Sequence, residues 1–491
     1  MNDDSFSFTF TMASRRRVVV TGIGAITPLG NTFSESWNAL LQGKCGITTL
    51  EEALKCQEED GGRGGASSSS SLLSPLDWNL ARQLPSQVAA PVRNVPHDAR
   101  TARFVQLALL ASRDALQNAQ LIPTNDTGAG ENNVDNDDDD DAAAPLADSS
   151  LLYSDPLRTG VSMGCAMPSP REYMDAIRLV DSDPKKGYRK LSPHFVPKAL
   201  GNSAAGRVSI AFGCQGPNQS AITACAAGSH AITDAYTSIQ MNQADVMLAG
   251  GTEACIDPLS LAGFCRLRAL STGLPPHQSS RPFDQERNGF VMGEGSAVLV
   301  LEELQHALSR HAPILGEVCG YGLSGDAHHI TSPHPEGRGA ERAMTLALQH
   351  AGIDDRNLVG YVNAHATSTP KGDEIEARVI HRVFAASTNS SRSHPLRVSS
   401  TKGATAHLLG AAGAIESAFT VQALYDQCIP HTLNLEQPDN NVEESSSLAF
   451  DHVQHQPLRL ADHDCLEVAM SNSFGFGGVN ACLVFRRWGG E

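Results

Sequence analysis

The sequence lacks any Cys-x-x-Cys motif, and its eleven cysteines show no paired spacing along the 491 residues. Structural zinc sites and disulfide frameworks depend on such spacing, so this absence argues against both and fits a reducing compartment. The sequence also has no apolar run of the ~18 residues that a membrane-spanning helix needs. We therefore expect a soluble protein with free thiols.

Basic residues are few relative to acidic ones, with 37 Lys and Arg against 54 Asp and Glu and a net charge of −17. This balance argues against nucleic acid or an anionic membrane as the main partner. Part of the excess lies in residues 124–155, which include the run Asp137 to Asp141 and no Lys or Arg. Such a run usually stays solvated and disordered, so we predict a surface insertion there.

A second surface insertion is predicted at residues 58–74, which are rich in Gly and Ser. Outside the two insertions, strand-like and helix-like patterns alternate, and the apolar content of 41% is enough for a large core. These features favour an α/β fold. There is also a weak internal symmetry, because residues 18–21 and 317–321 each begin one half of the chain with a strand-like run.

Among the residues that are present, Cys225 stands in a segment of small residues, Ile-Thr-Ala-Cys-Ala-Ala-Gly-Ser-His, at positions 222–230. The pattern predicts a tight turn that opens a helix. Unpaired amide groups and the dipole at a helix start favour a thiolate, which is the nucleophilic form of cysteine. Cys225 is therefore a candidate nucleophile, and the alternative is a buried structural thiol.

Three further segments have the composition of a catalytic site. His365 follows the strand-like run at residues 359–362, and loops at strand ends often carry chemistry. Lys402 and His407 lie in a second stretch that is rich in Gly and Ala, which permits close backbone contact. Residues 470–480 place glycines and serines around two aromatics, which predicts a loop with unusual dihedrals whose amides face a ligand. A plain glycine turn is the alternative.

Together these segments resemble the β-ketoacyl-acyl-carrier-protein synthases, the elongating condensing enzymes of dissociated fatty-acid synthesis. The similarity extends over nearly the whole chain and includes residues 18–30, 245–254 and 280–295. Several long motifs in one order are more specific than any single pattern. Residues 191–197 and 400–405 look closest to the mitochondrial branch of eukaryotes.

The resemblance implies an α/β protein with the duplicated, five-layer αβαβα thiolase-like fold. We expect an N-terminal tail at residues 1–17 and two thiolase-like halves at residues 18–310 and 311–491. A mitochondrial location is also implied by the resemblance. The tail itself is ambiguous, since Arg15 to Arg17 suit a transit peptide, Asp3 and Asp4 do not, and Met12 is an alternative start.

The resemblance also assigns the catalytic roles. Cys225 takes the acyl chain from the phosphopantetheine thiol of a carrier, and His365 and His407 hold the malonyl thioester oxygen while carbon dioxide leaves. The cationic head of Lys402 keeps the nearby charges in order. The backbone N–H groups of Cys225 and Phe474 form the oxyanion hole, and the Phe474 ring gates the mouth of the site.

Substrate and carrier binding are implied at Thr367, Thr369, Phe264 and Arg268. The two threonines meet the pantetheine arm, and Arg268 docks the acidic carrier, with Arg100 and Arg103 as further candidates. The expected partners are the acyl carrier protein and a second copy of the chain. The acidic insertion is either inert or a mimic of the carrier that lies across Arg268.

A structural monovalent cation is implied at Asn363, Glu416, Ser471 and Asn472. No cofactor is expected, because the phosphopantetheine arm enters as part of the substrate. His328, His329 and His334 lie in a segment that resembles a loop of the family, so we do not expect them to ligate a metal.

Three alternatives stay open at this point: a thiolase, a polyketide-type ketosynthase and a binding-only homologue. A thiolase would need a second reactive cysteine near the carboxyl end, where Cys482 lies in a strand pattern.

Two departures from the family pattern put small methyl groups beside the histidines, because Ala366 and Ala406 stand where relatives usually have glycine. If either position needs a positive φ, its backbone is strained.

Overall fold

The computed structural model describes residues 15–62, 74–96, 98–123, 151–183, 185–385, 395–439, 450–461 and 465–490. Eleven strands form one mixed sheet in the order β12-β10-β9-β14-β15-β8-β1-β7-β6-β4-β5. Their bounds are β1 Val18–Ile26, β4 Thr159–Gly164, β5 Asn218–Ala221, β6 Val246–Glu253, β7 Gly295–Glu303, β8 Gly316–Gly325, β9 Val359–Asn363, β10 Leu396–Ser399, β12 Phe450–His452, β14 Val468–Gly475 and β15 Val479–Arg486. Two small sheets pair β2 (Thr48–Thr49) with β3 (Val88–Ala89) and β11 (Cys428–Ile429) with β13 (Leu458–Arg459).

The strand order is duplicated. The N-terminal half reads β5-β4-β6-β7-β1, in which β5, β4 and β6 are parallel and β7 and β1 complete the half with antiparallel pairings. The C-terminal half repeats this as β10-β9-β14-β15-β8 with the same directions. The halves join where the start of β1 pairs with the start of β8. The structure confirms the expected duplication.

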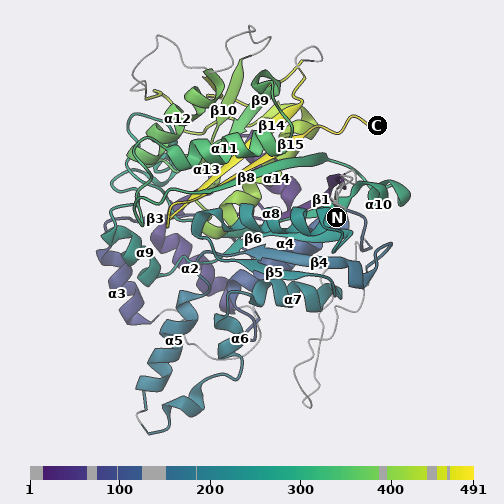
Figure 1. Ribbon diagram of the computed structural model, residues 1–491. Helices are drawn as coiled ribbons and strands as arrows, with labels where there is room; N and C mark the ends of the chain where they lie inside the picture. Colours follow the sequence, from purple (N-terminus) through teal and green to yellow (C-terminus); the bar gives the residue numbers. More distant parts are fainter. Residues whose placement is uncertain are drawn as a thin grey trace, which may run out of the picture.

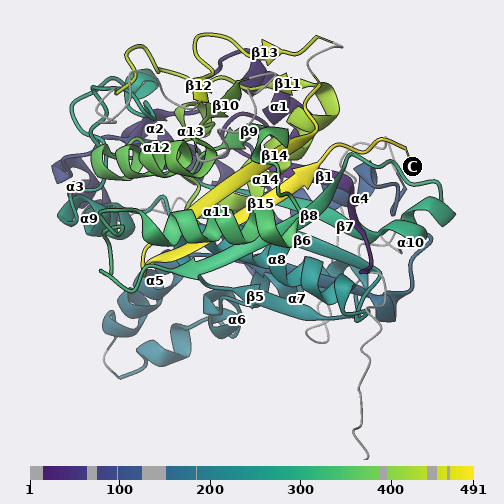
Figure 2. The ribbon, with the colours of Figure 1, turned by 45° about the horizontal axis from the view of Figure 1, so that its top comes forward.

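Helices complete the five layers (Figure 1). The outer helices α4 and α7 cover the N-terminal strands, α11 and α12 cover the C-terminal strands, and α8 and α14 lie between the two halves. Figure 2 shows α11 lying across β15 and β8. The helix bounds are α1 Phe33–Leu41, α2 Leu50–Gly62, α3 Pro75–Gln83, α4 Arg103–Asn118, α5 Pro170–Asp181, α6 Phe195–Ala199, α7 Ser203–Phe212, α8 Ala227–Gln240, α9 Pro258–Arg266, α10 Leu304–Ser309, α11 Arg338–His350, α12 Pro370–Ala385, α13 Lys402–Thr405 and α14 Ala412–Asp426.

The local sequence explains the central layer. Helices α8 and α14 consist largely of Ala, Gly, Ser and aliphatic residues and are buried on most of their surface. A helix that is apolar or small all round must be covered on all sides. The strand β1 is likewise buried at all nine positions, as expected for a sheet with helices on both faces. None of the helices in the described ranges is both long and apolar enough to span a bilayer.

Several predicted boundaries are wrong at their edges. Arg16 and Arg17 fall in the expected tail, yet they form ion pairs with Asp245 and Glu317 at the partly exposed edge of the folded domain. The insertion predicted at residues 58–74 begins inside α2, which continues to Gly62, and ends at the residue that caps α3. Residues 151–155 also belong to the fold, while residues 63–73 and 124–150 lie outside the described residues. Periodicity alone could not place these edges, because Gly and acidic residues continue into the helix.

The glycine-rich segment at residues 470–480 is also different from its prediction. Most of it is the straight strand β14, and the turn is confined to residues 476–478, where Gly477 and Gly478 have φ of 88° and 69°. Strand pairing with β9 on one side and β15 on the other overrides the low strand propensity of glycine and serine.

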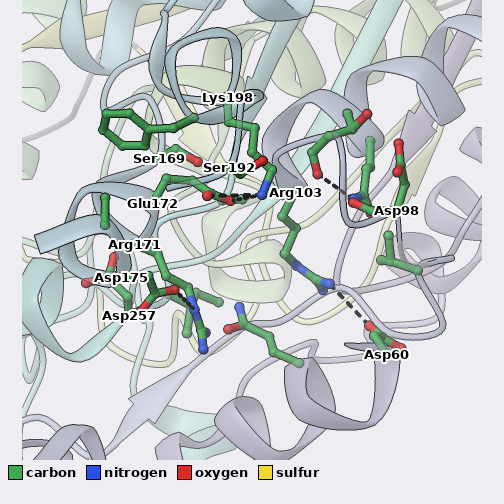
Figure 3. Close-up of a pocket in the computed structure, with 18 of the residues that line it drawn as sticks. Asp60, Asp98, Arg103, Ser169, Arg171, Glu172, Asp175, Ser192, Lys198 and Asp257 are labelled. Carbon is green, nitrogen blue, oxygen red and sulfur yellow. Dashed lines mark hydrogen bonds and ion pairs between the residues drawn. The ribbon is translucent and has the colours of Figure 1, made fainter. Parts of the chain in front are cut away.

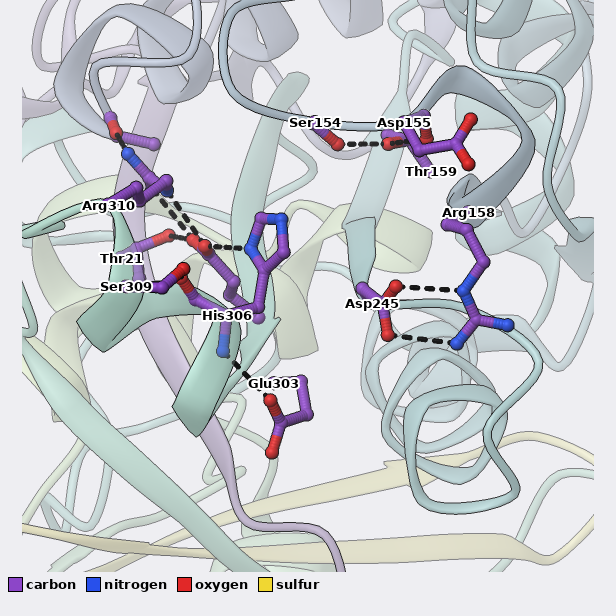
Figure 4. Close-up of polar contacts among 12 residues, drawn as sticks. Thr21, Ser154, Asp155, Arg158, Thr159, Asp245, Glu303, His306, Ser309 and Arg310 are labelled. Atoms are coloured by element: carbon purple, nitrogen blue, oxygen red, sulfur yellow. Dashed lines mark hydrogen bonds and ion pairs between the residues drawn. The ribbon is translucent and has the colours of Figure 1, made fainter.

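A buried ionic cluster stabilises the end of the N-terminal half (Figure 4). Arg310, His306 and Thr21 all bind the fully buried carboxylate of Glu302 on β7, with Arg310 Nη2 and Thr21 Oγ1 at 2.7 and 2.9 Å. The hydrogen bond that the His306 ring donates to Glu302 raises the pKa of His306, against the opposing effect of burial. The imidazolium therefore binds its proton more tightly in the folded state than in the unfolded state.

This linkage predicts a pH dependence of stability. The contribution of His306 is complete below its ordinary pKa and is lost as the pH rises through the higher folded value. In His306→Gln a neutral donor replaces the imidazolium. We expect the wild-type free energy of unfolding to fall more than that of the variant between about pH 6 and about pH 9 in urea titrations. Parallel pH curves for the two proteins would contradict this role.

Candidate active site

The nucleophile candidate lies on a sharp turn between β5 and α8. Ala224 has φ of 49°, a left-handed conformation that is rare for alanine, and a short 3-10 turn over Ala224–Ala226 leads into α8. The predicted turn is confirmed. Because the chain reverses here, the partly buried Cys225 thiol projects at the start of the central helix.

The structure brings both histidines to this thiol. His407 Nε2 lies 3.0 Å from Cys225 Sγ, although the residues are 182 positions apart. The rings of His365 and His407 are 5.4 Å apart between centroids and nearly perpendicular, and the Phe474 ring lies 5.7 Å from His365. The four segments singled out in the sequence therefore form one constellation.

Backbone contact between the central helices makes this convergence possible. A Cβ at Gly228 on α8 would lie 2.7 Å from Ala414 N, and one at Gly413 on α14 would lie 2.3 Å from Ser229 Oγ. Any side chain at these two positions would push the helices apart. Glycine thus fixes the separation of the helix starts, and with it the distance between Cys225 and His407.

The two alanine departures have different outcomes. Ala366 has an ordinary backbone, whereas Ala406 has φ of 62° and ψ of −170°, a region that normally belongs to glycine. Of these two alanines, Ala406 has the expected backbone strain and Ala366 does not. The strain persists because Ala406 N binds Lys402 O at 3.0 Å and the next residue, His407, binds Val291 O at 2.9 Å through its N–H.

The prediction of a resting thiolate is wrong. Burial raises the pKa of Cys225 to about 12, the Lys402 charge lowers it, and the carboxylates of Glu253 and Glu416 raise it. Desolvation disfavours the charged form more than the nearby helix start favours it. The resting group is the thiol, and it must lose its proton during the attack itself.

Both imidazoles are neutral. Burial lowers the pKa of His365 and of His407 well below the ordinary value, and the charge of Lys402 lowers both further. Lys402 is itself fully buried and pairs with Glu416 on α14. Burial raises the pKa of Glu416 to about 7, and Lys402 opposes that shift.

Glu376 on α12 is a site residue that sequence reasoning missed. Its carboxylate accepts hydrogen bonds from His365 N at 2.9 Å, Ala366 N at 2.7 Å and Asn472 Nδ2 at 3.0 Å. Burial raises its pKa to about 7, and these donors oppose the shift. The only signal in the sequence is an acidic residue on the apolar face of a helix, beside Ile375 and Val379.

A cavity of about 500 Å³ opens onto the nucleophile. It is lined by every residue that was expected to bind substrate: Phe264, Arg268, Thr367, Thr369 and Phe474. The hydroxyls of Thr367 and Thr369 lie 3.1 Å apart, and Arg268 is exposed just beyond α9. Cys482 is buried in β15 and does not line the cavity, so the position expected of a second thiolase cysteine holds no accessible thiol.

Comparison with known proteins agrees with this geometry. The family profile "Beta-ketoacyl synthase, N-terminal domain" matches residues 15–307, and "Beta-ketoacyl synthase, C-terminal domain" matches residues 315–436. The chain belongs to the beta-ketoacyl synthase family.

Relatives of this ketosynthase include the mitochondrial 3-oxoacyl-[acyl-carrier-protein] synthase of Arabidopsis thaliana, with 44% identity over 96% of this chain and 93% of the relative. The corresponding synthase 2 of Coxiella burnetii has 39% identity over 96% and 99%. Among solved structures, a type II polyketide ketosynthase in complex with its acyl-carrier protein has a TM-score of 0.76 at 28% identity over 96% and 100%. A beta-ketoacyl synthase from Burkholderia phymatum has a TM-score of 0.75 at 30% identity, with the same shares covered.

One docking candidate of the ketosynthase is placed elsewhere. Arg103 turns inward at the start of α4 and binds the buried carboxylate of Glu294 at 2.7 Å and Asp60 at 3.3 Å. It lines a second cavity of about 320 Å³, where Lys198 also pairs with Glu172 and Arg171 with Asp175 (Figure 3). The expectation that Arg103 docks a carrier is therefore wrong. Arg100 is exposed but does not line the catalytic cavity.

The four residues expected to hold a cation share one feature. Each has a buried oxygen without a hydrogen-bond partner among the described residues: Asn363 Oδ1, Glu416 Oε2, Ser471 Oγ and Asn472 Oδ1. Asn363 pairs with Ser471 across β9 and β14, and its Nδ2 donates to Glu416 O at 3.2 Å. Unpaired buried oxygens are costly, and an alkali cation would satisfy them. We propose that these residues hold a monovalent cation.

This proposal predicts a dependence of stability on the cation. Replacing potassium by tetramethylammonium at equal ionic strength should lower the melting temperature by about 3 °C or more, because the larger ion cannot enter a closed oxygen site. Ser471→Ala should weaken that dependence. Ser112→Ala, which removes another buried unpartnered hydroxyl, should retain it. Equal melting temperatures of the wild-type protein in the two salts would contradict the site.

Proposed function

We propose that this protein is a 3-oxoacyl-[acyl-carrier-protein] synthase of fatty-acid elongation, which joins an acyl thioester to a malonyl thioester with loss of carbon dioxide. The observation that carries the proposal is the 3.0 Å contact between Cys225 Sγ and His407 Nε2, with His365 beside it in a cavity. A nucleophile and two neutral imidazoles are the parts that this reaction needs.

In the first stage Cys225 receives the acyl group. As the sulfur attacks the thioester carbon, its proton moves to His407 Nε2 and then to the departing phosphopantetheine thiol. The new carbon–sulfur bond replaces the one that breaks, so the step is balanced. The amides of Cys225 and Phe474 serve as the oxyanion hole. The end of β14 supports this assignment, since a Cβ on Gly475 would lie 3.3 Å from Cys225 N.

In the second stage the malonyl thioester enters. Neutral His365 donates an Nε2–H to the carbonyl oxygen of this thioester, and neutral His407 does the same once its proton has moved from Nδ1 to Nε2 between the two stages. The bond to the carboxylate then breaks and carbon dioxide leaves. The electron pair forms the new carbon–carbon bond to the acyl carbon, the bond from that carbon to Cys225 Sγ breaks, and the departing thiolate takes up a proton from water to restore the thiol. Lys402 supports this stage because its charge keeps both imidazoles neutral and able to donate from a buried position.

No resident cofactor enters this scheme, since the phosphopantetheine arm arrives with the substrate. The acyl carrier protein is the proposed partner. Arg268 at the mouth of the cavity offers a cation to an acidic carrier, and Thr367 and Thr369 lie along the path of its arm. One similar solved structure, a type II polyketide ketosynthase in complex with its acyl-carrier protein, supports this partner.

We further propose a homodimer. The strand β5 is the outermost of the sheet, and an open edge is usually covered. Apolar side chains are exposed just after β5 and around α6. The exposed fractions are 55% for Ile222, 58% for Val196 and 47% for Leu200. A second copy of the chain pairing through β5 would bury them.

A mitochondrial location is proposed from the names of the Arabidopsis thaliana and Schizosaccharomyces pombe relatives, which are 44% and 39% identical. A polyketide-type activity has less support, because the similar polyketide ketosynthase structure is only 28% identical. The fatty-acid reaction is therefore the one to test.

The purified protein should extend acyl carriers in the presence of malonyl carrier, and mass spectrometry should detect each product lengthened by one acetyl unit. Cys225→Ala should abolish extension and the acyl adduct, since Cys225 provides the one thiol among the described residues that line the cavity. Cys482→Ala removes a buried thiol outside the cavity and should retain activity. Absence of extension by well-folded wild-type protein would favour a binding-only homologue.

A further inference from the structure

A buried carboxylate behind the cavity has no role in the scheme above. Glu253 is the last residue of β6 and is fully buried. Its Oε2 accepts hydrogen bonds from Ala166 N at 2.9 Å and from Gly410 N at 3.0 Å, and its Oε1 accepts one from Met167 N at 3.4 Å. The carboxylate therefore links the segment after β4 to the segment that follows His407.

Both linked segments border the reacting groups. Ala166 and Met167 pack in the same apolar cluster as Cys225. Gly410 lies three residues after His407, and a Cβ there would lie 2.3 Å from Ala166 N and 2.8 Å from Glu253 Oε2. The two segments are thus in backbone contact, with the carboxylate at their junction.

Hydrogen-bond donors around Glu253 favour its charged form, against the effect of burial. The thiols of Cys255 and Cys165 lie 3.1 and 3.6 Å from Oε1, so five donors surround the carboxylate. Burial raises the pKa of Glu253, and hydrogen bonds from Cys255 and from the three amides oppose this. Burial is also the main cause of the raised pKa of Cys225, and the charge of Glu253 adds to it.

We propose that Glu253 is a positioning residue of the condensation: it ties the His407 segment to the Cys225 side of the cavity and sets the electrostatic environment of the thiol. Glu376 does the same for His365 from the C-terminal half, since it holds the amides after β9, the strand equivalent to β4. The kinetic part of the proposal rests on the proposed function, whereas the effect on the thiol does not.

Two variants separate the hydrogen bonds from the charge. Glu253→Gln keeps a side-chain oxygen for Ala166 N and Gly410 N and removes the charge, whereas Glu253→Ala removes both. In Glu253→Gln we expect alkylation of Cys225 by iodoacetamide to be about threefold or more faster at pH 8, with the rate profile displaced to lower pH. Peptide mass spectrometry at Cys225 measures this rate without any requirement for activity.

The kinetic expectation concerns kcat. Glu253→Ala should lower kcat for condensation about 100-fold with little change in KM for the acyl carrier, because the imidazole is misplaced while the mouth of the cavity is intact. Glu253→Gln should keep most of the wild-type kcat. Cys255→Ser, which keeps a donor and the charge of Glu253, serves as the matched control and should show the wild-type pH profile.

A wild-type alkylation profile for Glu253→Gln would overturn the electrostatic part of the proposal. A kcat of folded Glu253→Ala within about threefold of wild type would overturn the positioning part. If Glu253→Ala does not fold, the pH profile of Glu253→Gln decides alone. A wild-type protein that alkylates as expected but does not condense would count against the proposed function and not against the effect of Glu253 on the thiol.

Discussion

The contact between Cys225 Sγ and His407 Nε2 is the constraint on which the rest of the site depends. The two residues belong to different halves of a duplicated fold, and each lies just before the start of one central helix. Their distance is set by backbone contact between α8 and α14, which only glycine at positions 228 and 413 permits. The fold therefore produces the site as a consequence of how closely its two halves pack.

Close packing also determines the electrostatics. A thiol and two imidazoles that are removed from water are driven to their neutral forms, and the buried Lys402 charge strengthens that effect for the imidazoles. Neutral imidazoles can donate hydrogen bonds to an oxygen on which negative charge develops, so burial prepares the decarboxylation stage. The cost is a thiol that needs a proton acceptor, and His407 lies where that acceptor is required.

The sequence identifies the segments that the structure brings together at the cavity, because their signals are local. Small residues around Cys225, a strand before His365 and a Gly- and Ala-rich stretch at His407 each identify a segment without reference to the others. The duplicated fold follows from the family resemblance and is visible in the repeated strand order.

Long-range effects are harder to predict. Buried Glu376 and Glu253 look like ordinary charged residues in the sequence, and Arg103 looks exposed. The positive φ of Ala406 depends on two hydrogen bonds, one from Ala406 N to Lys402 O and one from His407 N to Val291 O. The protonated resting thiol depends on burial that no local pattern encodes.

In the proposed reaction, one cysteine and two histidines divide the chemistry into acyl transfer and condensation. The most direct measurement is the mass of intact His365→Ala and His407→Ala proteins supplied with acyl carrier and malonyl carrier, together with analysis of the products. Both variants should accumulate the acyl adduct on Cys225 and form no elongated product, with slower acylation in His407→Ala because the missing imidazole is the acceptor of the thiol proton. Near-normal turnover in both variants would rule out this division of roles.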